Sequence, residues 1–163
     1  MDIKIRNVSI ADLDTVTEVE AKCFPKAEAA TKASFKQRIQ TFPESFFVAE
    51  LDGKIIGFIN GCLINETTID DQLFSEATLH IPNGDYQTIF GLTVISDYRN
   101  QGIAAQLINH LITVSKSAGR KGVVLTCKEN LIHYYSKFGF ENHGVSKSKH
   151  GGSKWYDMIL KFS

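Results

Sequence analysis

A short basic loop between an apolar segment and an amphipathic helix constrains the fold of this chain more than any other feature. The apolar segment ends at Ile95, the loop reads Arg99-Asn100-Gln101-Gly102-Ile103-Ala104, and hydrophobic residues then recur at helical spacing up to residue 112. Such a loop directs several unpaired backbone N–H groups towards one point, and the helix dipole adds partial positive charge there. Gly102 has no Cβ and lets an anion approach the backbone closely. The pattern therefore predicts a phosphate-binding turn between a strand and a helix.

The size and composition of the chain are those of one folded domain. The sequence has 163 residues, 43% of them hydrophobic and 11 of them phenylalanine, which favours a packed core over disorder. We therefore expect a single domain over residues 1–163. The 18 basic residues balance the 18 acidic ones. A nucleic-acid-binding surface would need a clustered basic excess, so we expect no nucleic-acid partner.

The cysteines and the N-terminal residues indicate a cytoplasmic protein. Cys23, Cys62 and Cys127 show no metal-ligand spacing, which is typical of free thiols in a reducing compartment and leads us to expect no metal site. Charged residues occupy positions 2, 4 and 6, where a signal peptide would be apolar. No apolar run approaches the roughly 20 residues of a membrane span, so no membrane association is expected.

Periodicity and turn signals predict alternating strands and helices. Asp52-Gly53, between two apolar runs, is a strong signal for a two-residue hairpin turn. Ser9 and Asp12 favour the start of a helix, and residues 69–80 are expected to form a short helix and a loop. We predict strands over 3–6, 46–51, 54–59, 88–95, 123–127, 140–145 and 155–162, and helices over 9–24, 29–40, 102–118 and 130–137.

Two motifs in this order resemble the GNAT N-acetyltransferase superfamily. The loop 99–104 is similar to the family's pyrophosphate loop, and residues 134–140, Tyr-Tyr-Ser-Lys-Phe-Gly-Phe, resemble its later tyrosine and Gly-Phe signature. The resemblance implies a GNAT fold of the α/β (α+β) class, with a mixed, mostly antiparallel seven-stranded sheet and helices on both faces. The fourth and fifth strands are expected to splay apart and hold the pantetheine arm of acetyl-CoA. Taken alone, the loop would also fit an ordinary strand-to-helix turn.

The resemblance also implies which residues bind the co-substrate acetyl-CoA. Backbone N–H groups of the loop would bind its pyrophosphate, with Arg99 supporting the loop and Asn100 at the rim. Residues 92–94 would pair with the pantetheine arm through main-chain hydrogen bonds, as a bound peptide adds to a sheet edge. The Val94 N–H or a close neighbour would stabilise the oxyanion. The expected cofactor-binding residues are Leu92, Thr93, Val94, Arg99, Asn100, Gln101, Gly102, Ile103, Ala104 and Tyr135.

Tyr135 is also the expected general acid. It occupies the tyrosine position of the family signature, and a tyrosine hydroxyl can protonate a departing thiolate. The alternative interpretation is a half-buried aromatic residue of a short helix. Tyr134 points elsewhere on such a helix and is expected to pack.

Residues 23–30, 66–87 and 126–131 resemble arylalkylamine N-acetyltransferases and their microbial relatives. This resemblance implies a small primary amine as acceptor. The animal enzymes carry two histidines on the strand that enters the site, where this chain has Thr88 and Phe90. Since an alkylammonium has a pKa of about 10.4, another deprotonation route is needed. The candidates are a water chain, Glu28, Asp85 and His80.

Glu28 is the preferred contact for the cationic amine, because its segment borders the acceptor pocket in the family. The alternative is a solvated acid at a helix N-terminus. Cys127 fits a core thiol better than an acyl-enzyme nucleophile, because it ends an apolar strand and has no evident histidine partner. Several phenylalanines are candidates for an aromatic wall or for plain core, namely Phe24, Phe42, Phe46, Phe47 and Phe90.

The sequence therefore predicts an N-acetyltransferase, with Tyr135 and Glu28 as catalytic residues. It would move an acetyl group from acetyl-CoA directly to a small, arylalkyl-type primary amine. The alternatives are acetylation of a protein N-terminus or lysine, and a non-catalytic sensor of acyl-CoA. A homodimer is suggested only by analogy with the family.

Overall fold

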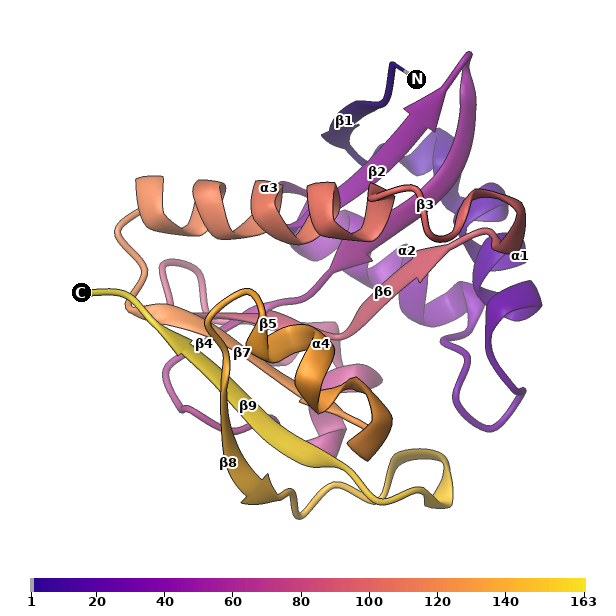
Figure 1. Cartoon of the computed structure of the whole chain (residues 1–163). Helices are drawn as coiled ribbons and strands as arrows, with labels where there is room; N and C mark the ends of the chain where they lie inside the picture. The colour runs from indigo at the N-terminus through magenta and orange to yellow at the C-terminus, as the bar shows by residue number, and fades with distance from the viewer. Residues whose placement is uncertain (1) are drawn as a thin grey trace.

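The computed structural model describes residues 2–163 and shows two sheets that diverge from each other (Figure 1). The first sheet is antiparallel, with the strand order β1-β2-β3-β6. The second sheet has the order β4-β5-β7-β9-β8, in which β5 and β7 are parallel and the other pairs antiparallel. The strands are β1 (Lys4–Asn7), β2 (Phe46–Leu51), β3 (Lys54–Asn60), β4 (Leu63–Ile64), β5 (Tyr86–Ile89), β6 (Gly91–Val94), β7 (Gly122–Cys127), β8 (Glu141–Val145) and β9 (Tyr156–Lys161).

The expected strand over residues 88–95 is wrong as a continuous element, because the chain breaks at Phe90 into β5 and β6. Asn60 of β3 is the register partner of Gly91. The Asn60 carbonyl oxygen nevertheless accepts the N–H of Phe90, at 2.7 Å. Two residues thus oppose one, which is a β-bulge that bends the strand. The partner strand breaks at the same level, between β3 and β4. The divided strand and the additional short strand β4, which lies outside every expected strand, account for nine strands in place of seven.

The bulge separates β6 from β7. Before it, β5 pairs with β7 as far as Ile89 opposite Leu125. After it, β6 pairs with β3, whereas β7 continues beside β9. The expected splay of two central strands is therefore present, because β6 and β7 diverge after the bulge (Figure 1).

Within the described residues, four α-helices cover the sheets. The helices α1 (Leu13–Cys23) and α2 (Lys32–Thr41) lie behind the first sheet, and α3 (Ile103–Ser117) and α4 (Ile132–Ser136) lie on the other face (Figure 1). α2 starts later than expected, at a cap where the Thr31 hydroxyl accepts the Ser34 N–H at 3.1 Å. Residues 69–80 form two 3-10 turns, Asp71–Phe74 and Ala77–Leu79, in place of the expected short helix. No helix within residues 2–163 is long and apolar enough to cross a membrane.

The core lies on both faces of the first sheet. Leu107, Ile108 and Leu111 of α3 are fully buried against the inner face of the strands. On the other face, Val16 of α1 and Phe35 of α2 pack onto the sheet. The first of these clusters includes Val94 at the end of β6 and Ile103 at the start of α3, and so it holds the two elements that flank the loop in place.

Candidate active site

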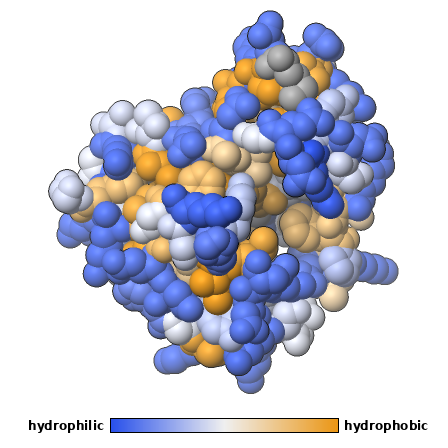
Figure 2. Space-filling model, viewed as in Figure 1, coloured by the Kyte–Doolittle hydropathy of each residue, from blue (hydrophilic) through white to orange (hydrophobic). Residues whose placement is uncertain are grey.

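All of the predicted cofactor-binding residues except Gln101 line one cavity between β6, the loop before α3, and α4. Its volume is about 590 Å³. Figure 2 shows this face of the molecule hollowed, with hydrophobic residues exposed in the hollow. Gln101 is exposed and its amide donates to the Asp97 carbonyl oxygen at 3.4 Å, so its side chain lies outside the cavity. We call this cavity the cofactor cleft.

The loop before α3 has the backbone geometry of an anion-binding turn. Gly102 caps the helix with a φ of 81°, and Asn100 has a φ of 62°. A Cβ added at Gly102 would meet no heavy atom within 4 Å. Glycine is therefore favoured at this position by the left-handed backbone conformation and not by close packing. The space in front of Gly102 is open for a ligand. The Arg99 Nε donates to the Val94 carbonyl oxygen at 3.1 Å and ties the loop to the end of β6.

The strand β6 presents a free edge to the cleft. The Ile95 N–H donates to the Ile56 carbonyl oxygen of β3 at 2.9 Å. In an antiparallel pair alternate residues bond to the partner strand, so in this register the N–H groups of Leu92 and Val94 point away from β3 and into the cleft. The Val94 carbonyl already accepts from Arg99 and, at 3.7 Å, from the Cys23 thiol. Val94 therefore offers its N–H to a ligand.

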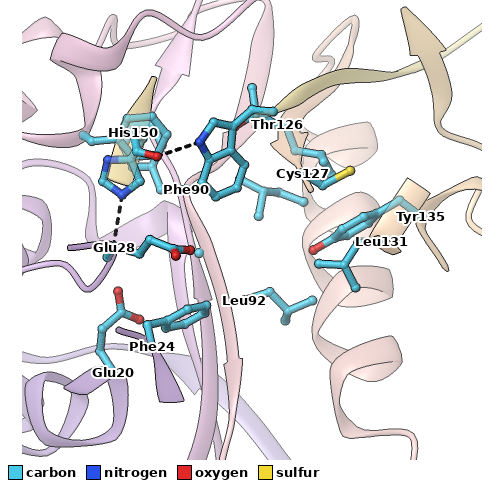
Figure 3. Close-up of a pocket in the computed structure, with 15 residues that line it drawn as sticks. Glu20, Phe24, Glu28, Phe90, Leu92, Thr126, Cys127, Leu131, Tyr135 and His150 are labelled. Carbon is cyan, nitrogen blue, oxygen red and sulfur yellow. Dashed lines mark hydrogen bonds between the residues drawn. The ribbon is translucent and has the colours of Figure 1, made fainter. Parts of the chain in front are cut away.

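A second cavity adjoins the cofactor cleft, and Figure 3 shows its lining. The two cavities share Phe24, Leu92, Leu131 and Tyr135. The second has a volume of about 130 Å³, close to the ~150 Å³ of an engineered apolar cavity that binds benzene. We call it the acceptor pocket. Its lining consists of Glu20, Phe24, Glu28, Phe74, Ile89, Phe90, Gly91, Leu92, Leu125, Thr126, Cys127, Leu131, Tyr135, His150 and Trp155.

Tyr135 stands where the two cavities meet, with its hydroxyl directed into the pocket (Figure 3). It is only 8% exposed, so it is more buried than the half-buried residue considered above. Its ring packs edge-on against Tyr134 and Phe140. Burial raises the pKa of Tyr135 well above its ordinary value. The hydroxyl therefore keeps its proton at neutral pH and can donate it.

Glu28 lies at the rim of the acceptor pocket and is already paired. Its Oε2 is 2.9 Å from the Lys128 Nζ, and its carbonyl oxygen is 3.1 Å from the His150 Nε2 (Figure 3). The other sequence candidates for a base lie elsewhere. Asp85 pairs with Lys121 on the surface, and the His80 Nδ1 accepts the Leu63 N–H at 3.0 Å. Neither side chain lines the pocket or the cleft.

The five candidate phenylalanines divide between the acceptor pocket and the core, and Cys127 is buried. Phe24 and Phe90 line the acceptor pocket, whereas Phe42, Phe46 and Phe47 belong to the core. Cys127 is 2% exposed, and burial raises the pKa of its thiol to about 11. A thiol that stays protonated is a poor nucleophile, which favours the core interpretation of Cys127.

Sequence reasoning missed several pocket residues, among them Glu20, His150 and Trp155. Glu20 follows Val16 by four positions on the apolar face of α1, and a carboxylate on such a face was the one available signal. The Trp155 Nε1 donates to the His150 carbonyl oxygen at 2.8 Å (Figure 3). These two residues come from the segment between β8 and β9, and nothing in its sequence pattern placed it at the pocket.

The chain matches the model of the acetyltransferase (GNAT) family over residues 13–140. This match covers most of the chain, and the protein belongs to that family. Binding of acetyl-CoA is typical of that family.

Individual relatives agree with this membership. The uncharacterized N-acetyltransferase MJ1207 of Methanocaldococcus jannaschii is 29% identical over 96% of this chain and 66% of that protein. The serotonin N-acetyltransferase of Mesocricetus auratus is 26% identical over 86% of this chain and 69% of that protein. The chain spans 32%, 66% and 58% of the lengths of the first curated relatives it matches.

The fold itself is shared with solved structures. The GphF GNAT-like decarboxylase in complex with isobutyryl-CoA superposes with a TM-score of 0.84, at 20% identity, over 97% of this chain and 98% of that chain. At this identity the likeness concerns the fold alone. The acceptor of this protein has to be argued from its own pocket.

Proposed function

We propose that this protein transfers the acetyl group of acetyl-CoA directly to a small primary amine, of which arylalkylamines are the first class to test. The observation that carries the proposal is the junction of the two cavities at Leu92 and Tyr135. A thioester held along β6 would reach this junction from the cofactor cleft, and an amine would reach it from the acceptor pocket. Acetyl transfer then needs no covalent intermediate on the protein.

Each step of the proposed transfer has a group in place. Backbone N–H groups of the loop around Gly102 would bind the pyrophosphate, and the edge of β6 would pair with the pantetheine arm. The Val94 N–H would stabilise the oxyanion. Tyr135 would protonate the departing thiolate, and Glu28 at the rim would attract the ammonium form of the acceptor.

Two features of the pocket support a small aromatic amine. Phe24, Phe74, Phe90 and Trp155 supply aromatic walls, and the volume of about 130 Å³ fits roughly one ring. The similarity to a serotonin N-acetyltransferase, at 26% identity, points the same way.

The test is thiol release from acetyl-CoA across a panel of tryptamine, phenethylamine, polyamines, amino acids, aminoglycosides and short peptides. We expect turnover with the two arylalkylamines. Turnover with peptides alone would contradict the proposal and favour acetylation of protein amines. Tight binding of acetyl-CoA with no turnover across the panel would favour a sensor of acyl-CoA.

A further inference from the structure

Glu20 is a buried carboxylate of the acceptor pocket that the roles above do not use. It lies in the last turns of α1 and is 6% exposed. Its side chain lines the pocket beside Phe24 and Leu92. Figure 3 shows Glu20 and Tyr135 on opposite sides of the pocket, with Leu92 between them. The carboxylate therefore stands across the proposed reaction point from the expected general acid.

Two hydrogen bonds hold the Glu20 carboxylate in place. Its Oε1 accepts from the Thr93 hydroxyl at 3.1 Å, and its Oε2 accepts from the Ala30 N–H at 2.9 Å. One donor belongs to β6 and the other to the segment before α2. Each carboxylate oxygen can accept a second hydrogen bond. The group is thus fixed relative to the strand that carries the Val94 N–H, and it keeps capacity for a substrate donor.

The charge of Glu20 has no direct partner. Within residues 2–163, no basic side chain lies within ion-pair distance of it. Arg38 is buried near it but donates to the Asn60 Oδ1 at 3.0 Å and to the Phe74 carbonyl oxygen at 2.9 Å. Glu28, the other carboxylate of the pocket, is paired with Lys128. A buried carboxylate without a direct cation is costly, and a substrate ammonium would supply that cation.

We propose that Glu20 accepts the proton of the acceptor ammonium, and that Thr93 is a positioning residue for it. This inference rests on the proposed function. One proton passes from the nitrogen to the carboxylate and leaves a neutral amine. The nitrogen attacks the thioester carbonyl carbon, the C–S bond breaks, and the sulfur takes the Tyr135 proton. The nitrogen's second proton restores the Tyr135 hydroxyl through solvent, and Glu20 releases its own proton to solvent.

The surroundings of Glu20 suit a base. Transfer of the proton removes two charges from a pocket where charges are poorly solvated. Burial raises the pKa of Glu20, while the hydrogen bonds from Ala30 and Thr93 and the charges of Arg38 and His150 lower it, and the net pKa lies above the ordinary value. A raised pKa makes a carboxylate a stronger base. The titratable and charged groups that line the acceptor pocket, the cofactor cleft and a third cavity beside Arg38, or that pair with them, are Cys23, Glu28, Arg38, Asp71, Tyr98, Arg99, Cys127, Lys128, Tyr134, Tyr135 and His150.

The first test compares Glu20→Gln with Glu18→Gln, which removes the same charge from an exposed position of the same helix. The acceptors are phenethylamine and 2,2-difluoro-2-phenylethylamine, whose fluorines lower the pKa of the amine so that it is mostly neutral at neutral pH. We expect Glu20→Gln to lower kcat for phenethylamine by about 100-fold, to lower it much less for the fluorinated amine, and to keep acetyl-CoA affinity. Equal losses for the two amines, or no loss, would overturn the proposal.

A second variant keeps the carboxylate and removes one of its supports. In Thr93→Val the hydroxyl that lowers the pKa of Glu20 is gone, so that pKa rises. A base with a higher pKa is protonated sooner as the pH falls, so the acid limb of kcat/KM should move to higher pH. Glu18→Gln should leave the limb where it is. An acid limb that stays in place in Thr93→Val would contradict the role of Glu20.

If the wild-type protein releases no thiol with either amine, the proposed function is contradicted. The contact between Glu20 and the ammonium is then tested by amine binding alone. Trp155 is the one tryptophan of the chain and lines the pocket, so its fluorescence reports phenethylamine bound in the presence of CoA. We expect Glu20→Gln to weaken this binding about 10-fold, the loss of a charge-assisted hydrogen bond, and Glu18→Gln to leave it unchanged. Equal binding by both variants, or no binding by the wild type, would overturn the inference.

Discussion

At the scale of single residues, the environment of each ionisable group in the pocket sets it apart from the others. The Tyr135 phenol is buried among aromatic rings and retains its proton. Glu28 is neutralised by Lys128, whereas Glu20 is held by two neutral donors. The Cys127 thiol, with a pKa raised to about 11, stays protonated. These surroundings support the proposed roles of Tyr135 as the acid, Glu20 as the base and Glu28 as the contact for the ammonium.

Replacing Tyr135 by phenylalanine tests the proposed acid without changing its shape. The hydroxyl faces the pocket, and the ring makes the packing contacts (Figure 3). We therefore expect Tyr135→Phe to lower kcat about 100-fold and to weaken acetyl-CoA binding far less. Steady-state kinetics with phenethylamine and a titration with acetyl-CoA measure both. An unchanged kcat would remove Tyr135 from the chemistry.

At the scale of elements, the site depends on a loop that the sequence shows and on a bulge that it does not. The strand, the basic loop and the amphipathic α3 were all predicted, because each is a local pattern of hydrophobic spacing and of one glycine. The hairpin at Asp52-Gly53 was confirmed for the same reason. The break at Phe90 was missed, since this β-bulge depends on the pairing of Asn60 in β3 with both Phe90 and Gly91. Local patterns thus predicted the elements. The bend between β5 and β6 was not predicted, because it depends on hydrogen bonding to the neighbouring strand.

The helix that follows the loop offers a matched pair of glycines for testing the cleft. Gly102 and Gly119 flank α3 with φ values of 81° and 78°, and an added Cβ meets nothing within 4 Å at either position. Glu at either site should therefore cost about 1–3 kcal/mol of backbone strain. Only Gly102→Glu places a carboxylate in the cofactor cleft, so only that variant should lose acetyl-CoA binding in calorimetry. Retained binding in Gly102→Glu, or equal loss in Gly119→Glu, would refute the assignment of the loop.

At the scale of the whole molecule, the acceptor pocket is built from segments far apart in the chain. His150 contacts Glu28 across 122 positions, and Glu20 receives a hydrogen bond from Thr93 across 73 positions. No local pattern reports such contacts. The family signature at Tyr135 and the cleft residues could be found from the sequence, because they follow one another in single segments. The roles of Glu20, His150 and Trp155 could not, because they arise only when both sheets and the segment after β8 come together.

Two-substrate kinetics tests the central claim most directly, since the account places a cofactor in one cavity and an amine in the next. Initial rates would be measured with acetyl-CoA and phenethylamine varied together. Because both substrates must be bound at once for direct transfer, the account predicts reciprocal plots that intersect, with the same pattern in Cys127→Ala. Parallel plots, accompanied by an acetylated protein when acetyl-CoA is added alone, would show a covalent intermediate and contradict the account.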